Sequence, residues 1–291
     1  MKDCNLNDKS SLLERIQNLR EHGSKGHKRI AAFLSEQGAK AAGMTAAVLA
    51  SETGVSEPTV VRFAKELGYD GYPEFQAAFR NALKNRMTST ERLSLLSSRK
   101  TESMVKHTLS AEIRSLKETL ESTDEKTFAE IVSLLLGAKK VYVVGNRSST
   151  ALADYFYFYA SLILDNVNLV QYATGSDLFE QMIRVGKGDV VFGITFPRYS
   201  RRTVDAMTFA RKNGAVTVAV TDSELSPVVP LADKVLFAKN DVSSFVDSLV
   251  APMALLNALI SALGAKREPE TAANLERLEE LWEEFTVFDR K

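Results

Sequence analysis

Residues 49–63 have the sequence LASETGVSEPTVVRF, and this stretch decides how the first third of the chain folds. Its spacing predicts two short helices joined by a tight turn, because Gly54 suits the left-handed backbone that ends a helix. Ser56 is expected to cap the second helix through its hydroxyl, and Pro58 fits a first helical turn, where its missing N–H is not needed. Ala50 is small enough to let the second helix cross the first closely. The stretch therefore predicts a helix-turn-helix.

The outward face of the second helix is polar and carries positive charge, which suits the major groove of DNA. The candidate DNA-contacting residues are Ser56, Glu57, Thr59, Arg62 and Lys65. We expect Arg62 and Lys65 to contact phosphates or guanine edges, and the three residues at the helix start to reach bases or neighbouring phosphates. An ordinary helical hairpin in a core is the alternative for the same spacing. The exposed Arg and Lys favour the helix-turn-helix.

Composition places the chain among ordinary globular proteins, with 291 residues, 45% apolar residues and zero formal net charge. The first residues are polar and no apolar run approaches the ~18 residues of a membrane span. We therefore expect a cytoplasmic protein that has no membrane partner. Cys4 is the single cysteine, so there is no internal disulfide. His22, His27 and His107 stand apart on polar helical stretches and are predicted to be solvated, so we expect no metal site and no cofactor.

The pattern along the chain predicts four parts. They are a helix-turn-helix domain over 1–86, a linker over 87–105, a second domain over 106–267 and a docking helix over 268–291. Five helices are expected in the first domain. Residues 1–90 hold 13 Lys and Arg against 10 Asp and Glu, a mild excess that is compatible with a dimer presenting two modest basic faces.

The second domain alternates strands with helices, which predicts a doubly wound parallel sheet of five strands covered on both faces. The expected strands are Val141–Val144, Val167–Tyr172, Val190–Phe196, Ala215–Val220 and Lys234–Phe237. The expected helices between them are Ser149–Leu164, Asp177–Val185 and Arg202–Asn213. A sheet of this kind binds ligands at the carboxyl ends of its strands.

Two loops at that edge carry the candidate ligand-binding residues. The first loop supplies Asn146, Arg147, Ser148 and Ser149, and the second supplies Thr195, Arg198, Ser200, Arg201 and Thr203. Hydroxyl groups, free backbone N–H groups at a helix start and clustered guanidinium groups favour an anionic ligand, since the arginines repel one another otherwise. The alternative is that each arginine is a solvated surface residue paired with Asp or Glu.

The last helix, from Thr271 on, is amphipathic. Leu275, Leu278, Trp282 and Phe285 share one side, and acidic residues cover the other. The helix is therefore expected to dock, either on its own domain or on a second subunit, and the sequence leaves both open.

These motifs together resemble the RpiR-type bacterial transcriptional regulators, which join a helix-turn-helix domain to a sugar-isomerase (SIS) domain with an α/β/α sandwich fold. The likeness runs from about Leu12 to about Leu263. It is carried by the segments GVSEPTVVRF (54–63), LGY (67–69), GYPEF (71–75), GNRSS (145–149), SP (226–227) and AD (232–233).

The resemblance implies that Ser148 and Ser149 match the first phosphosugar loop, and that Thr195, Ser200 and Thr203 match the second. The usual second loop is Ser-x-Ser-Gly-x-Thr. Here residues 196–199 lengthen it by about two residues, and Arg201 replaces the glycine. A larger and more positive loop suits a more acidic ligand than a simple hexose phosphate, and the alternative is that the loop fills the pocket.

The resemblance implies a regulator that binds double-stranded DNA at a near-palindromic operator as a homodimer or homotetramer, with a phosphosugar or other anionic sugar as effector. No catalytic residue is expected. The competing hypothesis is a sugar-phosphate isomerase with a helical appendage, which would need a placed general base. Asp154, Asp177 and Glu180 are the acid candidates near the loops, and the helix-surface spacing of Asp154 and Glu180 favours solvated positions for these two. A scaffold that makes no DNA contact is the third hypothesis.

Overall fold

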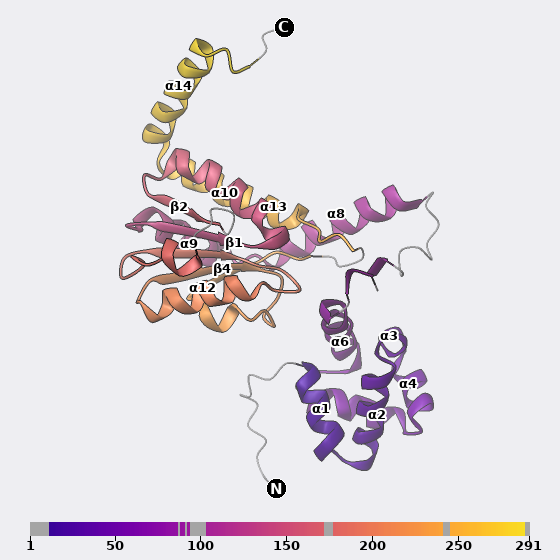
Figure 1. Cartoon of the computed structure of the whole chain (residues 1–291). Coiled ribbons are helices and arrows are strands. Elements are labelled where there is room, and N and C mark those ends of the chain that lie inside the picture. Colours follow the sequence, from indigo (N-terminus) through magenta and orange to yellow (C-terminus); the bar gives the residue numbers. More distant parts are fainter. Residues whose placement is uncertain are drawn as a thin grey trace. The chain divides into compact units, whose positions relative to one another are not determined.

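A computed structural model describes residues 12–86, 88–90, 92–93, 103–171, 177–240 and 245–288. The chain divides into two compact units, residues 1–91 and 92–291. The described part of the first unit is helical, and the second unit combines helices with a parallel sheet (Figure 1). The predicted fold class is confirmed. Residues 94–102, the middle of the predicted linker, lie outside the described residues.

The helices of the first unit pack around an aromatic cluster. They are α1 (Leu12–His22), α2 (Lys25–Glu36), α3 (Gly38–Ala41), α4 (Ala46–Thr53), α5 (Glu57–Glu66) and α6 (Tyr72–Arg86). Phe63 on α5 meets Phe75 on α6 edge to face at 5.7 Å, and Phe75 stacks on Phe79 at 5.7 Å. The sequence predicted five helices. The four-residue α3 was missed because one turn is too short to give a periodic apolar pattern.

The turn between α4 and α5 has the predicted geometry. Gly54 ends α4 in the left-handed region with φ of +63°, and its N–H donates to the carbonyl groups of Ala50 and Ser51. The N–H of Val55 also donates to the Ala50 carbonyl, at 3.0 Å. Ala50 and Val60 are buried between the two helices. The helix-turn-helix is therefore present and is closed by a glycine cap.

The predicted cap at Ser56 is wrong in one respect. Ser56 occupies the N-cap position of α5 with an extended backbone, but its hydroxyl makes no capping hydrogen bond. The hydroxyl instead lies 2.9 Å from the hydroxyl of Thr59. The N–H of Thr59 already donates to the Ser56 carbonyl at 2.9 Å, so the backbone donor that a capping hydroxyl would serve is occupied.

His27 is buried, which corrects the prediction that it is solvated. Its imidazole lies edge-on to Phe63 at 5.5 Å, and Nδ1 is 2.8 Å from a carboxylate oxygen of Glu66. His27 shares the inward face of α2 with Ile30 and Leu34, at the i, i+3, i+7 spacing of one helix side. The polar neighbours of His27 in the sequence concealed that spacing. Its contact ties α2 to α5.

The second unit is a five-stranded parallel sheet with strand order β2-β1-β3-β4-β5. Its strands are β1 (Val141–Gly145), β2 (Val167–Val170), β3 (Val190–Ile194), β4 (Val216–Thr221) and β5 (Lys234–Phe237). Its α-helices are α8 (Met104–Ser122), α9 (Glu125–Gly137), α10 (Thr150–Ile163), α11 (Leu178–Gln181), α12 (Arg201–Lys212), α13 (Val250–Lys266) and α14 (Glu268–Glu284). The short helices η2 (Arg147–Ser149) and η4 (Val229–Leu231) follow β1 and precede β5.

Alternate residues of β1 enter different cores. Val141 and Val143 pack with α9, α10 and α13 on one face of the sheet, whereas Tyr142 and Val144 pack with α11 and α12 on the other. The chain therefore leaves β1 toward one face and β3 toward the other. Neighbouring strands whose connections diverge in this way leave a crevice at their carboxyl ends.

Several predicted ends shift by a few residues. The third strand ends at Ile194 instead of Phe196, and the helix expected over 177–185 covers only Leu178–Gln181. Tyr172, at the predicted end of the second strand, lies outside the described residues.

The last helix, α14, has no buried residue along its 17 residues, although Asn274 donates to the Leu162 carbonyl on α10 at 3.0 Å. In Figure 1 it projects beyond α13, away from the sheet. None of the described helices combines the length and the apolar composition that crossing a membrane requires.

The Gly54 cap gives a test of the helix-turn-helix. Gly54→Ala is expected to cost about 1 kcal/mol, because a Cβ is disfavoured at this φ. Hydrogen exchange of α4 and α5 amides in the full chain should quicken by roughly fivefold. Gly43→Ala is the matched control, since Gly43 lies in the same unit outside the positive-φ region, and a Cβ there would make only an ordinary contact of 3.9 Å with the Lys40 carbonyl oxygen. Equal exchange in both variants would contradict the assigned cap.

Candidate functional site

The loop after β1 begins with a close approach between backbone and helix. A Cβ added to Gly145 would lie 2.5 Å from the Ser149 carbonyl oxygen and 2.7 Å from the Ala153 Cβ. Only glycine lets the chain turn into η2 and α10 this tightly. The next residues are Asn146, whose side-chain amide donates to the Thr203 hydroxyl on α12 at 3.1 Å, and Arg147, which takes a left-handed backbone with φ of +60°.

The loop after β3 is closed by its own hydrogen bonds. The N–H of Ser200 donates to the Thr195 hydroxyl at 3.2 Å, and the Tyr199 hydroxyl donates to the Asp222 carboxylate beyond β4 at 2.9 Å. Arg198, at the tip, also has a left-handed backbone with φ of +67°. Ser200 is the N-cap residue of α12. The lengthened loop is therefore built against the sheet.

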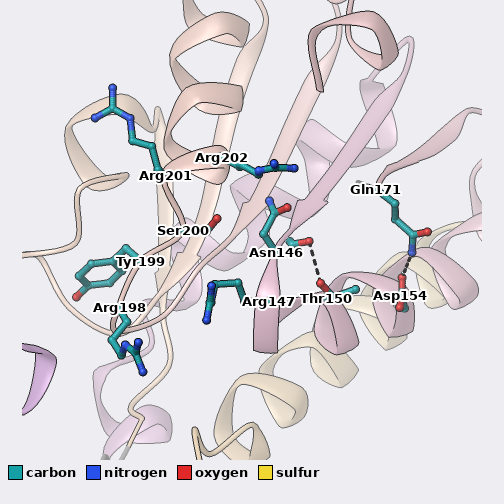
Figure 2. Close-up of a pocket in the computed structure, with 11 residues that line it drawn as sticks. Asn146, Arg147, Thr150, Asp154, Gln171, Arg198, Tyr199, Ser200, Arg201 and Arg202 are labelled. Carbon is teal, nitrogen blue, oxygen red and sulfur yellow. Dashed lines mark hydrogen bonds between the residues drawn. The ribbon is translucent and has the colours of Figure 1, made fainter. Parts of the chain in front are cut away.

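The two loops enclose a pocket of about 870 Å³ at the crevice between β1 and β3 (Figure 2). Its lining residues are Gly145, Asn146, Arg147, Thr150, Asp154, Gln171, Arg198, Tyr199, Ser200, Arg201 and Arg202. The volume lies in the range of small-molecule sites.

Five of the nine residues predicted to bind the ligand line this pocket, namely Asn146, Arg147, Arg198, Ser200 and Arg201. The other four lie beside it. Ser149, Thr195 and Thr203 are buried, and the Ser148 hydroxyl donates to the Asp247 carboxylate at 2.9 Å. Thr195 and Thr203 accept the hydrogen bonds that shape the loops.

Six lining residues are outside the predicted set, namely Gly145, Thr150, Asp154, Gln171, Tyr199 and Arg202. Asp154 and Gln171 are a bonded pair among them. Asp154 lies one helical turn after Thr150 on α10, so the four-residue spacing from the loop was the signal that could have placed it at the rim. Gln171 directly follows β2. Its side-chain amide donates to the Asp154 carboxylate. Asp154, expected to be a solvated helix residue, is half-buried in the pocket.

Positively charged side chains outnumber negatively charged ones in the pocket lining. Among the lining residues that the structure describes, four arginines face a single carboxylate, that of Asp154. Arg201 pairs with Asp205 at 3.0 Å on the solvent side. The guanidinium of Arg147 makes no hydrogen bond or ion pair with any described residue. Such a lining favours an anion and can hold phosphate oxygens through guanidinium N–H groups. In the described ranges no group of His, Cys, Asp and Glu side chains is placed to hold a metal ion.

The anchor of the second loop is a half-buried acid, Asp222. Burial raises the pKa of Asp222 above its ordinary value, although hydrogen bonds from Tyr199, Ser223 and Thr221 act in the opposite direction. Burial, reinforced by Asp222, also raises the pKa of the Tyr199 phenol. The phenol therefore stays protonated, and its O–H donates a hydrogen bond to the Asp222 carboxylate.

The raised pKa of Asp222 predicts a stability difference that depends on pH. A raised pKa means that the fold favours the protonated acid, so stability is lost as the pH rises from about 4 through the folded-state pKa. Asp222→Asn removes this loss. Its melting temperature relative to wild type should therefore rise between pH 4 and pH 8. Asp165→Asn, an exposed substitution, should show no such trend, and a constant offset for Asp222→Asn would contradict the assignment.

The five candidate DNA-contacting residues lie together on α5 and its N-cap. Ser56, Glu57, Arg62 and Lys65 are exposed and Thr59 is half-buried. Arg62 donates to the Thr59 hydroxyl at 3.2 Å, and that hydroxyl also meets Ser56. A single polar surface therefore runs along the outer side of α5.

Helix α2 packs against the start of α5 and supports its polar surface. A Cβ at Gly26 on α2 would lie 3.0 Å from a methyl carbon of Thr59. Arg29 on α2 donates to the Gly54 carbonyl in the turn at 3.2 Å. Both contacts fix where α5 begins.

Comparison with known proteins gives matches over both units. The family model for the helix-turn-helix domain of the rpiR family matches residues 10–86, and that for the SIS domain matches residues 134–262. The transcriptional regulator HexR of Escherichia coli is 26% identical over 293 residues and aligns over 97% of each chain.

Two solved structures have related folds. The sugar isomerase domain of an RpiR transcription factor from Sphaerobacter thermophilus matches with a TM-score of 0.58 and 26% identity, over 61% of this chain and 99% of that one. The Vibrio vulnificus NanR protein, complexed with ManNAc-6P, matches over 96% of this chain and 100% of that one, with a TM-score of 0.60. At 22% identity the likeness to NanR concerns the fold alone.

Proposed function

We propose a mechanism for this chain, which belongs to the RpiR-type transcriptional regulators with a helix-turn-helix domain and a SIS domain. In this mechanism the SIS domain binds a phosphorylated or acidic sugar, and that binding changes the affinity of the helix-turn-helix domain for operator DNA. The observation that carries the proposal is the pocket at the β1–β3 crevice, where four arginines face one carboxylate. The phosphosugar complex of the related-fold NanR supports the same ligand class.

Within the pocket, the predicted residues divide into two roles. Asn146, Arg147, Arg198, Ser200 and Arg201 contact the effector, because they line the pocket. Thr195 and Thr203 hold the loops through their hydrogen bonds with Ser200 and Asn146. Ser148 and Ser149, in the η2 turn, remain candidates for binding the effector.

Binding of DNA uses the outer side of α5. Arg62 and Lys65 contact phosphates or guanine edges in the major groove, and Ser56, Glu57 and Thr59 reach bases or phosphates at the helix start. The Thr59 hydroxyl bridges Ser56 and Arg62, so the recognition surface is partly ordered before DNA arrives. Two copies read the half-sites of a near-palindromic operator.

A homo-oligomer would couple effector binding to DNA binding. Helix α8 offers a surface through which two copies of the chain could associate. The small residues Ala111, Ser115 and Thr119 face the chain's own second unit and are buried. The large apolar residues lie on another side of the helix and are exposed, namely Val105, Leu109, Ile113 and Leu120. Large apolar side chains on the solvent side of a helix indicate a partner surface. A coupling of ~1–3 kcal/mol would change DNA affinity by 5- to 150-fold.

Catalysis is not part of the proposal. Aldose–ketose isomerisation needs a positioned general base. Within the described part of the pocket lining, Asp154 is the single carboxylate and there is no histidine, and Asp154 is hydrogen bonded to Gln171.

A crossed pair of variants tests the proposed division of labour. Arg62→Ala should weaken binding to the duplex upstream of its own gene by at least tenfold, measured by fluorescence anisotropy, yet keep the thermal shift given by ManNAc-6P or by hexose phosphates. Arg147→Ala should keep DNA affinity and lose both the thermal shift and the effect of those sugars on DNA binding. Arg20→Ala, an exposed α1 residue paired with Glu36, is the control. If both variants lost the same activity, the two sites would not be separate.

The α8 surface has its own test. Leu109→Glu combined with Ile113→Glu should convert the oligomer to a monomer in sedimentation velocity, because two buried carboxylates would face each other across the contact. Circular dichroism should stay native, since both side chains are exposed in the single chain. Lys117→Glu, an exposed change on the same helix, serves as the control. An unchanged sedimentation coefficient in the double variant would place the interface elsewhere.

A further inference from the structure

The effector pocket has two chemically different ends. Figure 2 shows Arg198 and Arg201 on one side and Asp154 with Gln171 on the other, with Arg147, Arg202 and Asn146 between them. The first end carries clustered positive charge. The second end carries one amide and the only carboxylate among the lining residues that the structure describes.

The carboxylate end is held in place by a chain of hydrogen bonds. The Gln171 side-chain amide donates to the Asp154 carboxylate. The backbone of Gln171 is in turn clamped by the side chain of Gln181, which accepts from the Gln171 N–H at 3.0 Å and donates to its carbonyl at 2.7 Å. The backbone of Gln171, whose side chain bonds to Asp154, is therefore held in place before a ligand binds. A surface carboxylate that was merely solvated would need no such support.

The chemistry of this end suits hydroxyl groups. An ionised carboxylate is acceptor-only and has about four lone-pair directions, of which the Gln171 amide uses one. Sugar hydroxyls donate O–H and form charge-assisted hydrogen bonds with such an acceptor. A second anionic group at this end would meet the Asp154 carboxylate instead, and like charges repel strongly in a half-enclosed site.

We propose that the Asp154–Gln171 pair binds the uncharged, hydroxyl-bearing end of the effector and rejects effectors with a second anionic group at that end. This inference rests on the phosphosugar-binding function proposed above. It narrows the class to sugars with one phosphate, oriented with the phosphate at the arginines and the polyol at Asp154. The lengthened arginine-rich loop then strengthens binding of the phosphate group. The Asp154–Gln171 end of the pocket determines which sugars are selected.

Two probes that differ at one carbon test this orientation. Glucitol 6-phosphate ends in a hydroxymethyl group where 6-phosphogluconate ends in a carboxylate. Isothermal titration of the full-length wild type should give at least tenfold tighter binding of glucitol 6-phosphate. Asp154→Asn keeps the size of the side chain and removes its charge, so the ratio should fall below threefold, mainly through tighter binding of 6-phosphogluconate.

Controls separate the two ends of the pocket. Inorganic phosphate should bind wild type and Asp154→Asn within twofold of each other, because it occupies only the arginine end. Arg147→Ala should weaken all three probes. Asp165→Asn changes the same charge on an exposed residue ahead of β2 and should leave the ratio at its wild-type value.

The outcomes that overturn the inference differ from those that overturn the proposed function. Equal or tighter binding of 6-phosphogluconate by wild type, or a ratio unchanged in Asp154→Asn, would overturn the role of the Asp154–Gln171 pair and leave the anion site standing. Failure of glucitol 6-phosphate, 6-phosphogluconate and inorganic phosphate alike to bind wild type would overturn both.

Discussion

The hydrogen bond from the Asn146 amide to the Thr203 hydroxyl joins the two halves of the second unit's rim. The β1–β3 ladder ends at the pair Gly145 and Ile194, and beyond it the two chains leave toward opposite faces of the sheet. Thr203 is fully buried at the start of α12, so its bond to Asn146 extends the connection from the ladder into the loops that carry the arginines.

Much of the fold could be predicted because the spacing of apolar residues along the sequence indicates which side chains are buried. The β-branched runs at residues 141–144 and 190–194 are buried on both faces, and parallel strands of that kind give an unbroken apolar pattern. The turn at Gly54 could also be predicted from the sequence, since a left-handed helix cap strongly favours glycine. The α3 turn and the burial of His27 could not be predicted, because a single turn has no period and the partner of His27 lies 39 residues away at Glu66.

The candidate site was predictable only in part, for a related reason. The sequence identifies the two loops, but it does not say which hydroxyl points into the space between them and which bonds across the backbone. Thr195 and Thr203 accept such internal bonds. Asp154 and Gln171 come together from α10 and the end of β2, 17 residues apart, and that pairing follows from the strand order β2-β1-β3.

Arg147 and Arg198 both have backbones that glycine adopts far more readily. Replacing either with glycine would relieve local strain and remove a guanidinium from the rim. Laboratory evolution of this protein for heat resistance alone would thus favour glycine at both positions and remove two of the guanidinium groups on which the proposed anion binding depends. Arginine at these two positions therefore gives up some stability of the fold in exchange for positive charge at the rim of the pocket.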